Sequence, residues 1–229
     1  MKVAVLYSGG KDSTFAIDYC RKKGWEISYL LSVKPTRKDC FLFHFATVEH
    51  TPLIAEMLNI PHHLISCSVA DPHQEALLVK EIVEKYPVDA VVLGGTGLQE
   101  TQIRSVQKAL APLGVKAFPA HFGFEHGNVF KTMIENGYEI LITQVASDGL
   151  NTWLGKTITK ENFAQLEKES LQYGFHIGFE GGYADTLVLD APFFSKRLVI
   201  ETKHAIWDDK YCGHLILDKI KIADKILAL

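Results

Sequence analysis

The stretch KVAVLYSGGKDS, residues 2–13, joins a short apolar run to a polar turn that contains two adjacent glycines. Residues 2–7 are rich in apolar and β-branched side chains, as in a parallel strand that is buried on both faces. From Ser13 to Lys23 the apolar side chains recur with helical spacing, and Gly24 stands where a helix often ends. A buried strand that enters a helix through a glycine turn is typical of an α/β fold.

The same alternation continues to about residue 118. Further strands are predicted at 26–33, 62–67, 89–93 and 116–118, and further helices at 48–58, 74–85 and 102–110. Residues 34–45 have no clear period and are expected to form a loop. This order predicts an α/β fold with an N-terminal doubly wound, Rossmann-like parallel sheet. Ligands bind such sheets at the carboxyl ends of the strands, so the glycine pairs Gly9-Gly10 and Gly94-Gly95 are expected to face one pocket.

The pattern changes after about residue 122. Helices are predicted at 128–136 and 160–173, and strands at 138–146, 186–189, 197–206 and 213–222. Strands and helices no longer alternate regularly, which predicts a smaller α+β domain. We therefore expect two domains, 1–122 and 123–229.

Composition excludes several classes of protein. Hydrophobic residues make up 47% and charged residues 22% of the 229 residues, as in ordinary globular proteins. A formal net charge of −3 gives no general attraction to nucleic acid or to anionic membranes. The four cysteines, Cys20, Cys40, Cys67 and Cys212, form no CxxC pair, so we expect reduced thiols in a cytoplasmic protein. No apolar run is long enough to predict a membrane span.

The turn at residues 8–13 (SGGKDS) has the composition of a phosphate-binding loop. Its glycines let backbone amides approach an anion closely, and the following helix points its amides and positive dipole end the same way. Lys11 adds a positive charge and Ser13 a hydroxyl donor. The structural alternative is a tight turn in which Asp12 or Ser13 caps the helix. The common P-loop is excluded because its lysine is followed by serine or threonine, not aspartate.

SGGKDS resembles the pyrophosphate loop of the N-type ATP pyrophosphatases. That resemblance implies that ATP is bound here and split into AMP and pyrophosphate with the help of Mg²⁺. A narrower resemblance covers most of the chain: residues 180–192 (EGGYADTLVLDAP) are similar to the EGGEYETLVLDAP segment of the diphthine–ammonia ligases. Arg104 and residues 128–158 also resemble that family, and so does His44 after the second strand.

The family resemblance implies a ligase reaction. ATP would activate the carboxylate of diphthine, a modified histidine on elongation factor 2, as an acyl-adenylate, and ammonium would supply the nitrogen of diphthamide. Lys11 and Asp12 would then act at the phosphates, with Asp12 as the Mg²⁺ ligand. Glu180 and Asp185 would hold ammonium, position the acceptor or take a proton from the amine. The first domain would bind ATP and the second the substrate.

The residues implied at these sites form two groups. The predicted ATP contacts are Ser8, Gly9, Gly10, Lys11, Asp12, Ser13, Leu31, Ser32, Gly94, Gly95 and Arg104. The predicted acceptor contacts are His44, Glu180, Gly181, Gly182, Asp185 and Thr186. Leu31 and Ser32 enter because the adenine packs near the end of the second strand in related proteins.

The chain departs from the family at the acceptor segment. Tyr183-Ala184-Asp185 stands where the family has Glu-Tyr-Glu, so Asp185 has a shorter reach and the first glutamate has no counterpart. This departure leaves other acceptors open, either a small molecule or tRNA. It also leaves open a sensor that binds ATP or AMP without turnover. The sequence is also compatible with a homodimer.

A histidine metal site is a further hypothesis for this sequence. His62, His63 and His73 lie close in sequence, and His121 and His126 lie five residues apart. No HxxxH helix with a supporting acid accompanies them, so the sequence does not favour a histidine metal site.

Overall fold

The computed structural model describes residues 1–36, 47–94 and 100–225. Its contacts divide the chain into two compact units, Met1–Gly123 and Phe124–Leu229. None of the helices in the described ranges is long and apolar enough to cross a membrane.

The first unit is built on one parallel sheet. Its strands are β1 (Lys2–Leu6), β2 (Glu26–Pro35), β3 (His62–Cys67), β4 (Ala90–Leu93) and β5 (Lys116–Pro119), and its helices are α1 (Lys11–Lys22), α2 (Thr51–Leu58), α3 (Pro72–Lys85) and α4 (Glu100–Leu110), with the 3₁₀ turns η1 (Val48–His50) and η3 (Ala111–Leu113). The sheet order is β3-β2-β1-β4-β5, and every neighbouring pair is parallel. The order therefore reverses between β1 and β4, where a doubly wound sheet binds its ligands.

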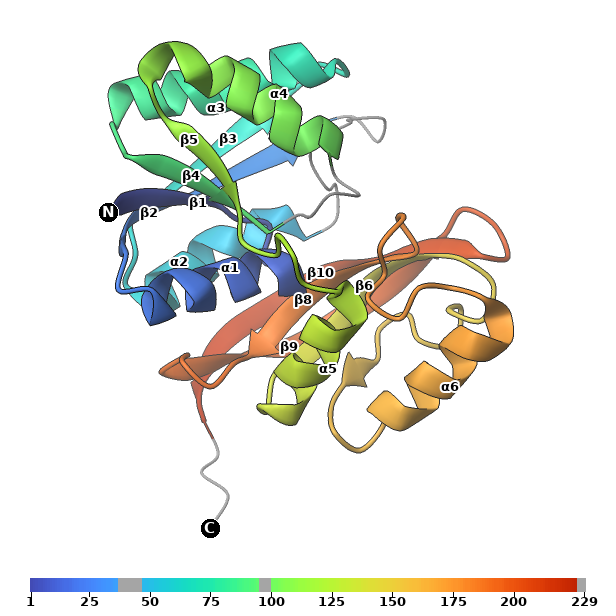
Figure 1. Ribbon diagram of the computed structural model, residues 1–229. Helices are drawn as coiled ribbons and strands as arrows, with labels where there is room; N and C mark the ends of the chain where they lie inside the picture. The colour runs from blue at the N-terminus through green and yellow to red at the C-terminus, as the bar shows by residue number, and fades with distance from the viewer. Residues whose placement is uncertain (37–46, 95–99, 226–229) are drawn as a thin grey trace. The chain divides into compact units, whose positions relative to one another are not determined.

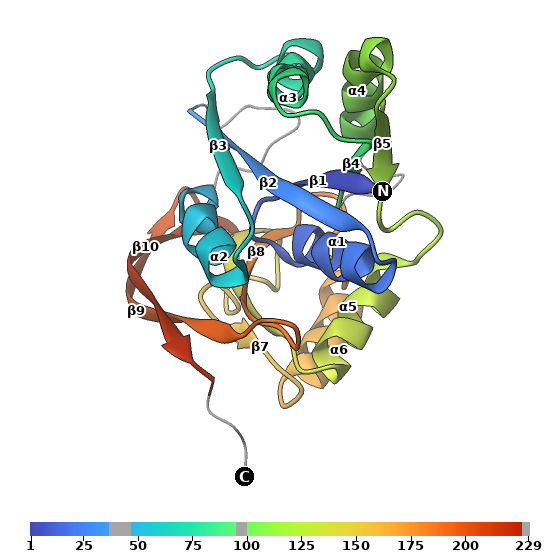
Figure 2. The same cartoon turned by 90° about the vertical axis from the view of Figure 1, so that its left-hand side faces the viewer.

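Helices cover both faces of this sheet. Figures 1 and 2 show α1 and α2 on one face and α3 and α4 on the other. Against α3 and α4 lies a core that includes Leu31, Val91 and Leu93 from the sheet and Val79 and Val106 from the helices. Strands buried on both sides explain why residues 2–7 and 90–93 are nearly all apolar.

The second unit is an antiparallel sheet with helices. Its elements are α5 (His126–Glu135), β6 (Glu139–Ala146), β7 (Thr157–Ile158), α6 (Phe163–Tyr173), β8 (Ala184–Asp190), β9 (Lys196–Trp207) and β10 (Cys212–Asp224). The strand order is β7-β6-β10-β9, and β8 also pairs with β6. α5 and α6 lie side by side (Figure 1), with the rings of Phe130 and Phe163 5.3 Å apart.

The predicted fold class is confirmed: a doubly wound parallel sheet is followed by an α+β unit. The helix starts were less accurate, because α1 begins at Lys11 and α3 at Pro72. In α3 the Asp71 carboxylate caps the helix by accepting a hydrogen bond from the Gln74 amide at 2.8 Å. The two-residue strand β7 was missed, since it is too short to show a period.

Candidate functional site

The loop between β1 and α1 is held by its own serines. The Ser8 amide donates to Ser13 Oγ at 3.2 Å, and the Gly10 amide lies 3.4 Å from Ser8 Oγ. The Ser13 hydroxyl donates in turn to the Gly10 carbonyl at 3.1 Å. Gly9 has a φ of 83°, in the left-handed region that glycine adopts without strain. The result is a fixed turn that ends at the N-terminus of α1.

Lys11 and Asp12 form an ion pair in this loop. Lys11 Nζ lies 2.9 and 2.7 Å from the two Asp12 carboxylate oxygens. The lysine side chain is 4% exposed and the aspartate side chain 27% exposed, so the carboxylate is the member of the pair that reaches the surface of the unit. A buried ammonium beside helix amides suits phosphate, and an accessible carboxylate oxygen suits Mg²⁺.

Gly94 brings the end of β4 against the start of α1. A Cβ added at Gly94 would lie 2.5 Å from the Asp12 carbonyl carbon and 2.6 Å from the Ser13 nitrogen. Atoms at these separations overlap, so only glycine fits there. Two strand ends that are more than eighty residues apart in sequence therefore meet at the point where the strand order reverses.

A network of hydrogen bonds through Ser32, His62 and Thr51 holds the residue that precedes the loop. The Ser32 hydroxyl donates to the carbonyl of Tyr7 at 2.6 Å, and Tyr7 is the residue before Ser8 in the loop. His62 Nε2 lies 2.8 Å from Ser32 Oγ and 3.2 Å from Thr51 Oγ1. Both hydroxyls donate elsewhere, Thr51 to the Val48 carbonyl at 2.8 Å, so Nε2 carries the proton and donates to them. The network connects β3, β2 and the end of β1.

This network makes stability depend on pH. Burial lowers the pKa of His62 from 6.5 to about 4. Because the unfolded chain binds its proton more readily, the stabilisation present above pH 6.5 is lost as the pH falls towards 4. Burial also lowers the pKa of His50 and that of His63.

We expect the urea midpoint of the wild type to fall between pH 7 and pH 5. His62→Gln is expected to be less stable at pH 7 and to show a smaller fall. His73→Gln, at an exposed position on α3, is the matched control and is expected to keep the wild-type pH dependence. An equal fall in wild type and His62→Gln would contradict this assignment.

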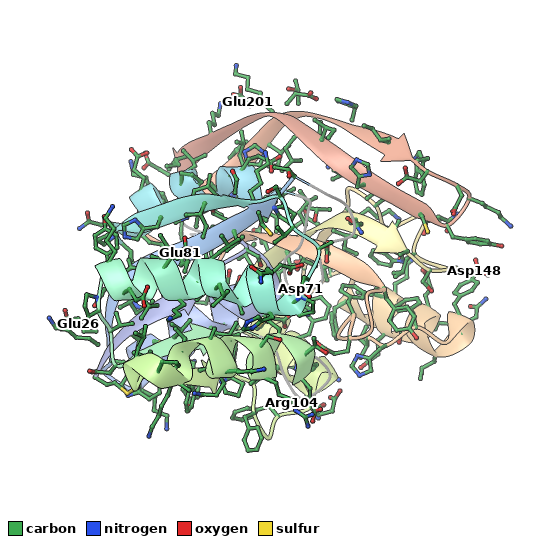
Figure 3. The ribbon with its side chains drawn as sticks, turned by 90° about the horizontal axis from the view of Figure 1, so that it is seen from above. Glu26, Asp71, Glu81, Arg104, Asp148 and Glu201 are labelled. Carbon is green, nitrogen blue, oxygen red and sulfur yellow. The ribbon has the colours of Figure 1, made fainter. Side chains whose placement is uncertain are left out.

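Three other predicted nucleotide contacts differ in burial. Leu31 is fully buried in the core behind the sheet, and Ser32 is fully buried with its hydroxyl bound to Tyr7. Their side chains therefore offer no surface to an adenine ring. Arg104 is 76% exposed on α4 (Figure 3) and pairs with Glu100 at 2.8 Å. Its phosphate contact stays a prediction.

Two predicted positions lie outside the described residues. These are His44 and Gly95.

In the second unit, Glu180 lies in a tight loop before β8. The side chain of Glu180 is 4% exposed and forms an ion pair with His126 Nδ1 at the start of α5. Gly181 and Gly182 follow with φ values of 99° and 82°. Residues 180–182 (EGG) thus form a turn in which both glycines have left-handed backbone conformations. The Glu180 carboxylate in this turn is buried, not solvated.

The other predicted acceptor residues lie in β8. Asp185 pairs with Gln144 and Thr186 with Ile142 of β6, and both are half-buried. Asp190, at the end of the same strand, has a structural role: its carboxylate accepts from the Ala191 amide and pairs with Lys225, each at 2.7 Å.

Sequence reasoning missed three histidines that contact predicted site residues. His62 bonds to Ser32, and His126 pairs with Glu180. His121 is fully buried, with Nε2 3.9 Å from Asp12 Oδ1 and its ring 4.4 Å from that of Phe15. The sequence presents each of these histidines only as a candidate metal ligand. No local pattern marks them, because their partners are distant in sequence.

Comparison with known proteins covers both units. Residues 1–117 match the diphthamide synthase N-terminal domain, and residues 125–222 match the diphthamide synthase C-terminal domain. The chain belongs to the diphthamide synthase family. A diphthine–ammonia ligase of Danio rerio is 27% identical over 251 residues, covering 98% of each chain. That of Mus musculus is 25% identical over 253 residues, covering 99% of this chain and 94% of the relative.

Membership in the diphthamide synthase family makes the chain an ATP-dependent ligase that forms a carbon–nitrogen bond. The resemblance inferred from SGGKDS and from residues 180–192 is thereby confirmed. Among solved structures, a chain described as a predicted subunit of tRNA methyltransferase from Methanocaldococcus jannaschii matches with a TM-score of 0.42 and 13% identity. That match covers 83% of this chain and 99% of the other.

Proposed function

We propose that this ligase converts a carboxylate to an acyl-adenylate and then to an amide, and that its acceptor is diphthine on elongation factor 2. The observation that carries the first part is the loop at residues 8–13, where a buried Lys11, the N-terminus of α1 and the Asp12 carboxylate converge. The acceptor follows from the family and from relatives named diphthine–ammonia ligases.

The adenylation step uses the first unit. A carboxylate oxygen of the acceptor attacks the α-phosphorus of ATP, and the bond from that phosphorus to the bridging oxygen breaks. Pyrophosphate leaves with the bonding electrons, so negative charge grows where the Lys11 ammonium and the loop amides are fixed. Asp12 would hold Mg²⁺, which neutralises phosphate charge when bound.

The amidation step uses the second unit. Ammonium first loses a proton, and its nitrogen then attacks the acyl carbon. The bond from that carbon to the AMP oxygen breaks, AMP leaves, and a second proton is lost from the new amide nitrogen. Glu180 is the carboxylate that we assign to the first proton, because it is ionisable and fixed in a tight turn. Asp185, Thr186, Gly181 and Gly182 complete the proposed acceptor segment.

Separation of AMP from ADP tests the reaction. Radiolabelled ATP is incubated with the protein, Mg²⁺ and ammonium, with and without elongation factor 2 that carries diphthine. We expect AMP and pyrophosphate in equal amounts, and only with that acceptor. AMP that forms without dependence on it would reject the acceptor and direct the search to small molecules or tRNA. ATP binding without product would favour a sensor, and ADP would reject adenylation.

A further inference from the structure

The N-terminus of α5 and the loop at residues 176–182 approach each other backbone to backbone. A Cβ added at Gly178 would lie 2.8 Å from His126 Cβ and 2.9 Å from the His126 carbonyl carbon. On the other side, a Cβ added at Gly127 would lie 2.6 Å from Ile177 Cγ2. At 178 the neighbouring atoms are the His126 Cβ and backbone, so only glycine permits this spacing, whereas at 127 the Ile177 side chain would have to move. This close approach fixes the position of the His126 Cβ relative to the loop.

The loop itself has a backbone conformation that its neighbours must enforce. Phe179 has a φ of 61°, which is rare and unfavourable for a bulky side chain. Its amide donates to the His176 carbonyl at 2.8 Å, and its ring lies 5.5 Å from that of Phe130 on α5. This turn places the next residue, Glu180, so that its carboxylate contacts His126 at the start of α5.

His126 and Glu180 form a buried ion pair at this point. Each side chain is 4% exposed, and Nδ1 of the imidazole contacts Oε1 of the carboxylate. A carboxylate removed from water is unfavourable unless a partner compensates its charge. By contrast, His176 and Glu125 in the same region are 38% and 53% exposed at a separation of 3.3 Å, so water already solvates that pair. Only the buried pair needs its histidine.

We propose that His126 is a positioning residue for Glu180 in the amidation step. The proposal rests on the function given above, in which Glu180 accepts a proton from ammonium. The contact from Nδ1 fixes Oε1, and because the carboxylate is planar, it also sets the direction of Oε2. A proton then passes from ammonium to the carboxylate, and the nitrogen keeps the electron pair with which it attacks the acyl carbon. His126 holds the Glu180 carboxylate in its direction, and it does not touch the substrate.

Two substitutions separate positioning from packing. His126→Asn keeps a nitrogen donor near the position of Nδ1, whereas His126→Ala removes it. With acceptor and ATP saturating, we expect His126→Ala to lower kcat/KM for ammonium by about 100-fold, the lower end of general-base effects. His126→Asn is expected to retain activity within about tenfold of wild type. The matched control is His204→Asn, whose histidine forms an exposed pair with Asp218 at 2.8 Å on the β9–β10 hairpin. It is expected to retain wild-type activity.

Hydroxylamine supplies the readout that a packing defect would not change. It is unprotonated at neutral pH, so it traps an acyl-adenylate as a hydroxamate without first losing a proton. We expect hydroxamate formation by His126→Ala to stay within about fivefold of wild type while amide formation falls. Equal losses for both nucleophiles in both His126 variants would overturn the proposal, and so would wild-type amide formation by His126→Ala. If the wild-type protein makes neither product, the proposed function is rejected, and with it the role of His126 in amidation.

Amide hydrogen exchange tests the positioning without any acceptor. Exchange over residues 176–183 is expected to be faster in His126→Ala than in wild type and to return towards the wild-type rate in His126→Asn. Unchanged exchange in His126→Ala would overturn the positioning role, whatever the acceptor is.

Discussion

Gly94→Ala is expected to abolish ATP-dependent AMP formation and to destabilise the chain by about 1–3 kcal/mol, the range for overpacking. The new methyl group would lie 2.5–2.7 Å from backbone atoms of Asp12 and Ser13. Backbone cannot move aside as a flexible side chain can, so the start of α1 must shift. The phosphate loop and the Lys11–Asp12 pair shift with it. The measurements are AMP formation and urea unfolding of the same preparations.

Gly114→Ala is the matched control for this prediction. Gly114 has a φ of 68°, and a Cβ added there meets nothing within 4 Å. Alanine at this position is expected to cost about 1–2 kcal/mol through the left-handed backbone alone. It therefore reproduces a loss of stability without touching the loop, and AMP formation at 25 °C is expected to remain. If Gly94→Ala forms AMP at the wild-type rate, the strand end at Gly94 is not part of the nucleotide site.

Lys11→Gln is expected to slow AMP formation by about 10²–10³-fold, as when one fixed donor is removed from a site of growing negative charge. The Lys11 ammonium is buried and bound by both oxygens of Asp12, so it is already in place before ATP arrives. Glutamine is one atom shorter and carries no charge. The rate is measured in a single turnover with labelled ATP, and ATP affinity is measured separately by equilibrium binding.

Lys22→Gln is the control on the same helix. Lys22 is 72% exposed in the last turn of α1 and pairs with Asp18 at 2.7 Å. Exposed pairs of this kind contribute at most about 1 kcal/mol, so wild-type AMP formation is expected. A Lys11→Gln variant that turns over as fast as the Lys22→Gln variant would remove Lys11 from the chemistry and leave it a structural role in the loop.

The candidate site was predictable where residues adjacent in sequence act together. The strand, glycine turn and helix of residues 2–22 are contiguous, so the loop at residues 8–13 was visible from spacing alone. The EGG segment was visible in the same way, through its resemblance to a family. Leu31 and Ser32 show the limit: they were expected near the end of a strand, whereas β2 continues to Pro35 and both side chains are fully buried.

The sequence by itself determined the alternation of elements, the α/β class with its α+β second part, and the family, because periodicity and short motifs depend on neighbouring residues. Only the tertiary structure decided which distant groups meet. It placed Gly94 against the backbone of Asp12, brought His62 into a hydrogen bond with Ser32, and paired His126 with Glu180. Such contacts depend on sheet order and on backbone spacings of a few ångströms. Residues that are tens of positions apart carry no local pattern that specifies either.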